Sequence, residues 1–135
     1  MAKYPFTRVD GVELSRELAR IAEKHLKCAR IAHASVYRGD AAEFTALDPY
    51  TFIYMFNPFP RVVVESVMRN LAASLQRQPR RVIVCYKNPT CADVVAAAGF
   101  RHFNTFDHSN HRFLVFLSPH HSTDEMPVYC PWRVD

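Results

Sequence analysis

The chain has 135 residues, a length suited to one domain with a core of its own. Hydrophobic residues make up 49% and charged residues 22%, an ordinary balance for a soluble globular protein with no stretch long enough to cross a membrane. The net charge of +4 is spread along the chain. Because no basic run of the length typical of nucleic-acid patches is present, nucleic acid is not an expected partner.

The first predicted elements are a strand at 9–14 and an amphipathic helix at 16–27, with Ser15 placed to cap the helix. A second strand is expected at 35–38, followed by a short helical turn at 41–45. These segments predict the beginning of an alternating α/β chain.

The middle of the chain continues the alternation. An apolar strand is expected at 51–56, and a helix with a buried stripe runs from Pro60 to Pro79. The stripe consists of Val64, Val67, Met68, Leu71, Ala72 and Leu75. A continuous apolar run at 82–86 is typical of a parallel strand that is covered on both faces.

The last elements are a short helix at 91–98, with Gly99 just past its end, and two strands at 101–107 and 112–117. Ser109 and Asn110 favour a tight hairpin between these strands. The predicted fold is therefore a Rossmann-like α/β sheet, mostly parallel, with helices on both faces and a C-terminal antiparallel hairpin. We expect one domain at 1–118 and an irregular tail at 119–135.

The cysteines form no C-x-x-C pair, and the first ten residues lack the apolar stretch of a secretion signal. We therefore expect reduced thiols and a cytoplasmic location. The four cysteines are Cys28, Cys85, Cys91 and Cys130. Metal binding is not expected, because the pairs His108/His111 and His120/His121 lack the accompanying ligands of known zinc motifs.

Acidic residues follow the first two predicted strands. Glu13 could accept hydrogen bonds from a ribose diol, or it could be a surface charge near a helix terminus. Asp40 could accept a hydrogen bond from an exocyclic amine such as N6 of adenine, or it could cap the turn at 41–45. The sequence leaves both pairs of alternatives open.

A polar turn follows the apolar strand at 51–56. The Asn57 amide oxygen could accept a hydrogen bond from a target amino group, and Phe59 could pack on a flat substrate. Asn57 and Pro58 could equally be a turn before a helix. Polar residues at the carboxyl ends of buried strands are favoured positions for ligands, so we expect a catalytic role for Asn57, Pro58 and Phe59.

Three segments occur in an order and spacing that resemble small bacterial class I S-adenosylmethionine-dependent methyltransferases. They are 9–19 (VDGVELSRELA), 39–44 (GDAAEF) and 54–59 (YMFNPF). Residues 79–89 and 98–100 also resemble this family, and the likeness extends over residues 8–117. The third segment departs from the family's Asn/Asp-Pro-Pro-aromatic pattern, because it has Phe59 and then Pro60 after Asn57 and Pro58.

The resemblance implies S-adenosylmethionine as cofactor and an unidentified methyl acceptor as the second partner. In the family, the acidic residue at the position of Glu13 holds the ribose, and the one at Asp40 contacts adenine. We expect the cofactor site to include Leu14, Ala41 and Asn57 as well.

The resemblance also implies a first strand and a glycine-rich loop ahead of residue 8, where the sequence has only 1–7. In the family this strand lies between the counterparts of 9–14 and 51–56. We therefore expect a sheet without its central strand, from a methyltransferase or a fragment of one. The alternative is an inactive remnant that binds a protein or self-associates through an exposed sheet edge.

Overall fold

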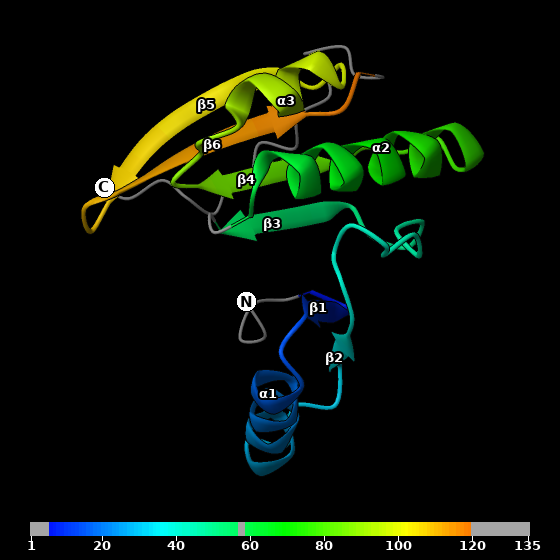
Figure 1. The fold of residues 1–135 in the computed structure, drawn as a ribbon, viewed down its shortest axis with the longest axis vertical. Helices are drawn as coiled ribbons and strands as arrows, with labels where there is room; N and C mark the ends of the chain where they lie inside the picture. Colours follow the sequence, from blue (N-terminus) through cyan, green and yellow to red (C-terminus); the bar gives the residue numbers. More distant parts are fainter. Residues whose placement is uncertain (1–5, 57–58, 120–135) are drawn as a thin grey trace.

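The computed structural model describes residues 6–56 and 59–119. The elements alternate as the sequence predicts (Figure 1). In chain order they are β1 Val9–Glu13, α1 Arg16–Cys28, β2 Ala34–Arg38, β3 Phe52–Phe56, α2 Arg61–Arg77, β4 Ile83–Lys87, α3 Ala92–Ala97, β5 Arg101–His108 and β6 His111–Leu117.

Local contacts explain where several elements begin and end. The Ser15 hydroxyl accepts a hydrogen bond from the Leu18 N–H at 3.3 Å, which confirms the predicted cap of α1. Ser109 and Asn110 have φ values of +49° and +63°, the conformation of a tight hairpin turn. Gly99 has a φ of +89° just past α3, where a side chain would be strained.

The short helical turn predicted at 41–45 is present as a 3₁₀-type turn and not as an α-helix. The N–H of Glu43 bonds to the Asp40 carbonyl and that of Phe44 to the Ala41 carbonyl. Both bonds span three residues and none spans four, so the segment is a short turn.

The strands form two separate sheets. In the first, β1 pairs with β2 in parallel. In the second, the order is β3-β4-β6-β5, with β3 and β4 parallel and with β6 antiparallel to both β4 and β5. The structure therefore has a mixed, mostly parallel Rossmann-like arrangement with a C-terminal hairpin, but β1 and β3 are not paired with each other.

The hydrophobic core lies between the four-stranded sheet and the two helices α2 and α3. Much of the predicted stripe of α2 is buried there, although Val67 and Ala72 are only half-buried. Central β4 is buried along Val84, Cys85 and Tyr86, as expected for a strand with both faces covered. The buried residues of α2 are Val64, Met68, Leu71, Ser74 and Leu75.

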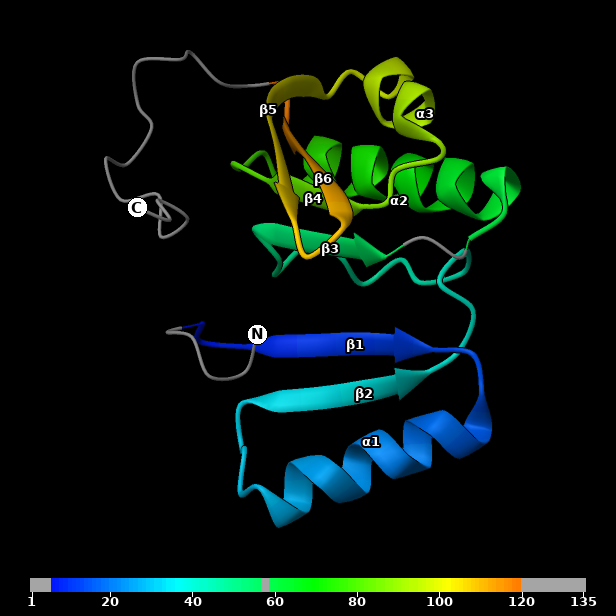
Figure 2. The same cartoon turned by 90° about the vertical axis from the view of Figure 1, so that its left-hand side faces the viewer.

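Helix α1 packs on β1 and β2, on the side of the strands opposite to α2 and α3 (Figures 1 and 2). The arrowheads of β1, β2 and β3 point the same way in Figure 2, so their carboxyl ends lie along one edge of the molecule. In the described part of the chain, no helix is both long and apolar enough to cross a membrane.

The segment that leads into β3 is held by Arg80. Its guanidinium donates to the Leu47 carbonyl at 2.7 Å and to the Tyr50 carbonyl at 2.9 Å. It also donates to the Ser74 hydroxyl at 3.0 Å. One side chain therefore ties the connection between β2 and β3 to the end of α2.

Among the described cysteines, Cys28, Cys85 and Cys91 are free thiols, and only Cys28 is exposed. Burial raises the pKa of the Cys85 thiol to about 11, so little thiolate is present at neutral pH.

We expect iodoacetamide to modify Cys28 at least about tenfold faster than Cys85 at neutral pH, because alkylation requires an accessible thiolate. Mass spectrometry of the digested protein gives the rate at each site. In urea the two rates should converge. Equal rates in the folded protein would contradict the burial of β4.

Candidate functional site

The carboxyl ends of β1 and β2 bring Glu13 and Asp40 to one edge. Glu13 lies opposite Arg38 in the parallel register, and the Gly39 N–H donates to the Glu13 carbonyl at 3.0 Å. Asp40 follows directly. The two predicted cofactor-binding carboxylates therefore lie next to each other at the edge where ligands of open α/β sheets bind.

Glu13 is half-buried, and its Oε1 accepts a hydrogen bond from the Ser15 N–H at 2.8 Å. This bond fixes the carboxylate at the start of α1. Its second oxygen has no hydrogen-bond partner within residues 6–56 and 59–119, so it remains able to accept from a ligand hydroxyl. The next residue, Leu14, is 72% exposed.

Asp40 is half-buried, and its Oδ1 accepts a hydrogen bond from the Ala42 N–H at 2.8 Å. Asp40 therefore caps the turn at 41–45, which is one of the two roles that the sequence left open for it. One oxygen serves the turn, and the other has no partner in the described part of the chain. Ala41 is half-buried in the same turn.

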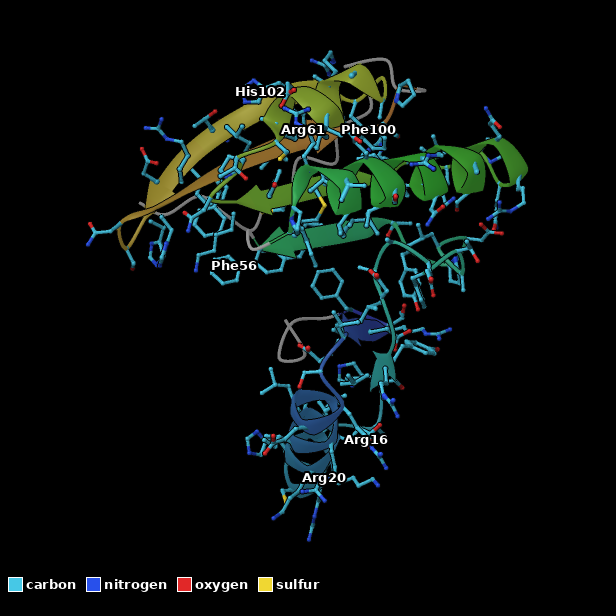
Figure 3. All side chains as sticks on the ribbon, in the orientation of Figure 1. Arg16, Arg20, Phe56, Arg61, Phe100 and His102 are labelled. Atoms are coloured by element: carbon cyan, nitrogen blue, oxygen red, sulfur yellow. The ribbon has the colours of Figure 1, made fainter. Side chains whose placement is uncertain are left out.

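Of the predicted catalytic residues, Asn57 and Pro58 lie outside the described residues. Phe59 is partly buried and packs against the hydrophobic core. Phe56, just before them, is 46% exposed and projects from the end of β3 away from α2 (Figure 3). The Lys87 ammonium lies 4.6 Å from the centre of the Phe56 ring, a cation–π contact at the carboxyl ends of β3 and β4.

A second polar cluster, which the sequence analysis did not identify, lies toward the amino-terminal ends of β1 and β3. The Asp10 side chain is only 4% exposed and accepts hydrogen bonds from Arg8 and from the Tyr50 hydroxyl. Burial and the bond to Asp10 raise the pKa of Tyr50. The second Asp10 oxygen, Oδ1, is buried and has no partner among the described residues. The available signal in the sequence was a second carboxylate in the strand that ends at Glu13.

A cavity of about 120 Å³ lies beside this cluster, lined by residues that include Phe6, Asp10, Tyr50 and Tyr54. Pockets for small molecules usually have about 300–1,000 Å³, so this cavity is too small for a nucleoside cofactor. It also lies at the end of the strands opposite to Glu13 and Asp40. The cavity is therefore separate from the candidate cofactor site.

Within the described ranges, no group of three or more histidine, cysteine, aspartate or glutamate side chains is arranged to hold a metal ion. His108 and His111 face each other across the β5–β6 hairpin. His120 and His121 lie outside these ranges.

No protein-family model matches the sequence, and no curated protein shows significant similarity to it. The structure, however, is similar to many solved structures. NodS, an N-methyltransferase from Bradyrhizobium japonicum, aligns with a TM-score of 0.65 at 10% identity, over 83% of this chain and 74% of its own. An S-adenosylmethionine-dependent methyltransferase from Aquifex aeolicus aligns with a TM-score of 0.62 at 11% identity, over 82% of this chain and 68% of its own.

The chain has the fold of these methyltransferases. A variant of MtNAS in complex with S-adenosylmethionine aligns over 82% of this chain with a TM-score of 0.62 at 18% identity. The chain spans 45% of that protein, and 64% of YhhF from Escherichia coli. Several of the similar proteins are therefore considerably longer than this chain.

Proposed function

We propose that the chain is an S-adenosylmethionine-dependent methyltransferase, or a fragment of one, which acts on an unidentified acceptor. The observation that carries the proposal is the pair Glu13 and Asp40 at the carboxyl edge of a methyltransferase-like fold. When bound, the cofactor supplies a methyl group on a sulfonium, which an acceptor takes by direct displacement. A cytoplasmic location is part of the same proposal.

The residues present fit the nucleoside half of the cofactor. Glu13 offers an unpaired carboxylate oxygen to the ribose hydroxyls, and the Ser15 N–H holds its other oxygen in place. Asp40 offers an oxygen to the adenine amino group while the Ala42 N–H orients its carboxylate. Hydrogen bonds to a charged partner each contribute about 1.5–3 kcal/mol, so both residues should matter for affinity.

The acceptor would approach the carboxyl end of β3. There the Asn57 amide oxygen would accept a hydrogen bond from an acceptor N–H, Pro58 would make the turn rigid, and Phe59 would pack on a flat acceptor. Leu14 and Ala41 would line the cofactor beside the two carboxylates. Holding the two reactants in line is the main task of such an enzyme, because orientation removes much of the entropic barrier.

The test is a calorimetric titration with S-adenosylhomocysteine, the product of methyl transfer. We expect Glu13→Gln to weaken binding about tenfold, because the amide replaces a charged acceptor with a neutral one. Glu43→Gln is the matched control, since Glu43 is exposed on the turn close to Asp40 and loses the same charge. Its affinity should equal that of the unmodified chain.

Two outcomes would count against the proposal. If the unmodified chain gave no binding at about 1 mM ligand, its affinity would be too weak for a cofactor present below that concentration. If both glutamate variants bound equally well, Glu13 would not be part of the site.

A further inference from the structure

The two sheets of this molecule are not joined by a ladder of backbone hydrogen bonds. In the part of the chain that the structure describes, β1 pairs with β2 and β3 pairs with β4, but β1 does not pair with β3. We call residues 6–38, with β1, α1 and β2, the first unit, and the four-stranded sheet with α2 and α3 the second unit (Figure 1). Backbone ladders fix how neighbouring strands lie within a sheet. The orientation of the first unit therefore depends on side chains and on the connection at 39–51.

The connection at 39–51 is attached to the second unit. The Asn70 amide on α2 donates to the Ala42 carbonyl at 2.9 Å. Arg80 donates to the Tyr50 carbonyl at 2.9 Å, and the Tyr50 side chain packs against the hydrophobic core. Because Tyr50 lies only two residues before β3, its backbone is a fixed part of the second unit.

The Tyr50 side chain reaches from this fixed position to the first unit. Its hydroxyl donates to Oδ2 of Asp10 on β1, and the Asp10 side chain is only 4% exposed. The Arg8 guanidinium donates to the same oxygen, and its central carbon lies 5.6 Å from the centre of the Tyr50 ring. Burial and the bond to Asp10 raise the pKa of Tyr50, so its hydroxyl keeps its proton at neutral pH and remains a donor.

Two pairs of aromatic rings also contact each other across the boundary of the first unit. The ring centres of Phe6 and Phe52 are 5.7 Å apart, and those of Tyr37 and Phe44 are 5.4 Å apart. Apolar contact is non-directional and tolerates sliding, whereas a hydrogen bond weakens steeply when its angle changes. The bond from Tyr50 is therefore the contact best suited to resist rotation of the first unit.

We propose that Tyr50 is a positioning residue, whose bond to Asp10 sets the orientation of the first unit relative to the second. Glu13 and Asp40 follow the strands of the first unit, whereas the acceptor would approach the end of β3 in the second unit. The bond would thus also hold the cofactor carboxylates at a set distance from the acceptor, and methyl transfer is sensitive to such a distance. This consequence rests on the proposed methyl transfer, but the orientation of the units does not.

The experiment measures the distance between two spin labels, one in each unit, by pulsed electron paramagnetic resonance. One label is attached to Cys28 of α1, which is exposed, and the other to Val62→Cys in α2, where Val62 is 64% exposed. Cys130 is replaced by serine, and the buried Cys85 and Cys91 stay in place. We expect one narrow distance distribution from this labelled chain.

Tyr50→Phe in the labelled chain should broaden the distribution at least about twofold, because the first unit then samples several orientations. Arg8 still pairs with the Asp10 carboxylate, so the variant should fold, which circular dichroism checks. Tyr37→Phe is the matched control, since the Tyr37 hydroxyl accepts from Arg8 at 2.7 Å within the first unit. It removes the same chemical group and should leave the width unchanged.

A cycle of variants separates the proposed role from general loosening. Asp10→Leu should broaden the distribution as much as Tyr50→Phe, and the two changes together should broaden it no further, because each removes the same bond. Asp10→Asn keeps a side-chain oxygen that can accept from the Tyr50 hydroxyl, so its distribution should stay narrow. If Asp10→Leu does not fold, Tyr50→Phe and Asp10→Asn decide the question.

Four results would overturn the inference. The first is a broad distribution in the labelled chain without further changes, and the second is an unchanged width in Tyr50→Phe. The third is equal broadening in Tyr37→Phe or in Asp10→Asn. The fourth is additive broadening in the double variant, which would mean that the two residues act separately. No ligand is present in these measurements, so their outcome is independent of the titration that tests methyl transfer.

Discussion

Replacing Leu71 with alanine should destabilise the protein by about 3–4 kcal/mol, the usual range for a fully buried leucine whose cavity cannot collapse. Leu71 is 0% exposed and lies in the cluster that joins α2 to the four-stranded sheet. Domains of this size are stable by only about 5–15 kcal/mol, so this loss is a large fraction of the total. Urea unfolding followed by circular dichroism measures the change.

Val62→Ala is the matched control, because Val62 is in the same helix but is 64% exposed. Its free energy of unfolding should stay within about 0.5 kcal/mol of the unmodified chain. If Leu71→Ala cost no more than Val62→Ala, α2 would not be packed on the sheet as described.

Replacing Arg80 with methionine should cost about 2–3 kcal/mol. The change keeps an aliphatic stem but removes hydrogen bonds to the Leu47 and Tyr50 carbonyls and to Ser74, each of which contributes about 1 kcal/mol. Arg80→Lys should recover less than half of the loss, since an ammonium cannot reproduce the planar fork of a guanidinium. Urea midpoints of the two variants and the unmodified chain give the comparison.

Arg69→Met serves as the control for Arg80→Met. Arg69 is exposed, and its guanidinium donates one hydrogen bond in the described part of the chain, to the Ser66 hydroxyl at 3.3 Å. Its loss should therefore be nearly neutral. A similar cost for both variants would mean that Arg80 does not hold the segment before β3.

The sequence predicted the order of elements well where local signals were strong. At three places the residue type alone favours a local conformation, and the structure confirms each of them. These are the helix cap at Ser15, the hairpin turn at Ser109-Asn110 and the positive φ of Gly99. The helical turn at 41–45 was a weaker prediction, because its hydrogen bonds depend on how Asp40 caps the segment.

The site was only partly accessible to sequence reasoning. Strand ends predicted that Glu13 and Asp40 would share an edge, and the parallel register of β1 and β2 places them there. The Asp10–Tyr50 contact joins residues 40 apart in sequence, so no local pattern could reveal it. The roles of Asn57 and Pro58 remain predictions, as do those of the two carboxylates.

The separation of the two sheets has a consequence for how the molecule loses its structure. Within β1, α1 and β2, only Ala19 is buried, whereas the remainder contains an extensive core. Segments with few buried apolar contacts open at lower free energy than the regions around a core. Residues 9–38 should thus melt as a cooperative unit of their own, at milder conditions than the sheet that contains β4, and unfolding of the chain should proceed in two stages.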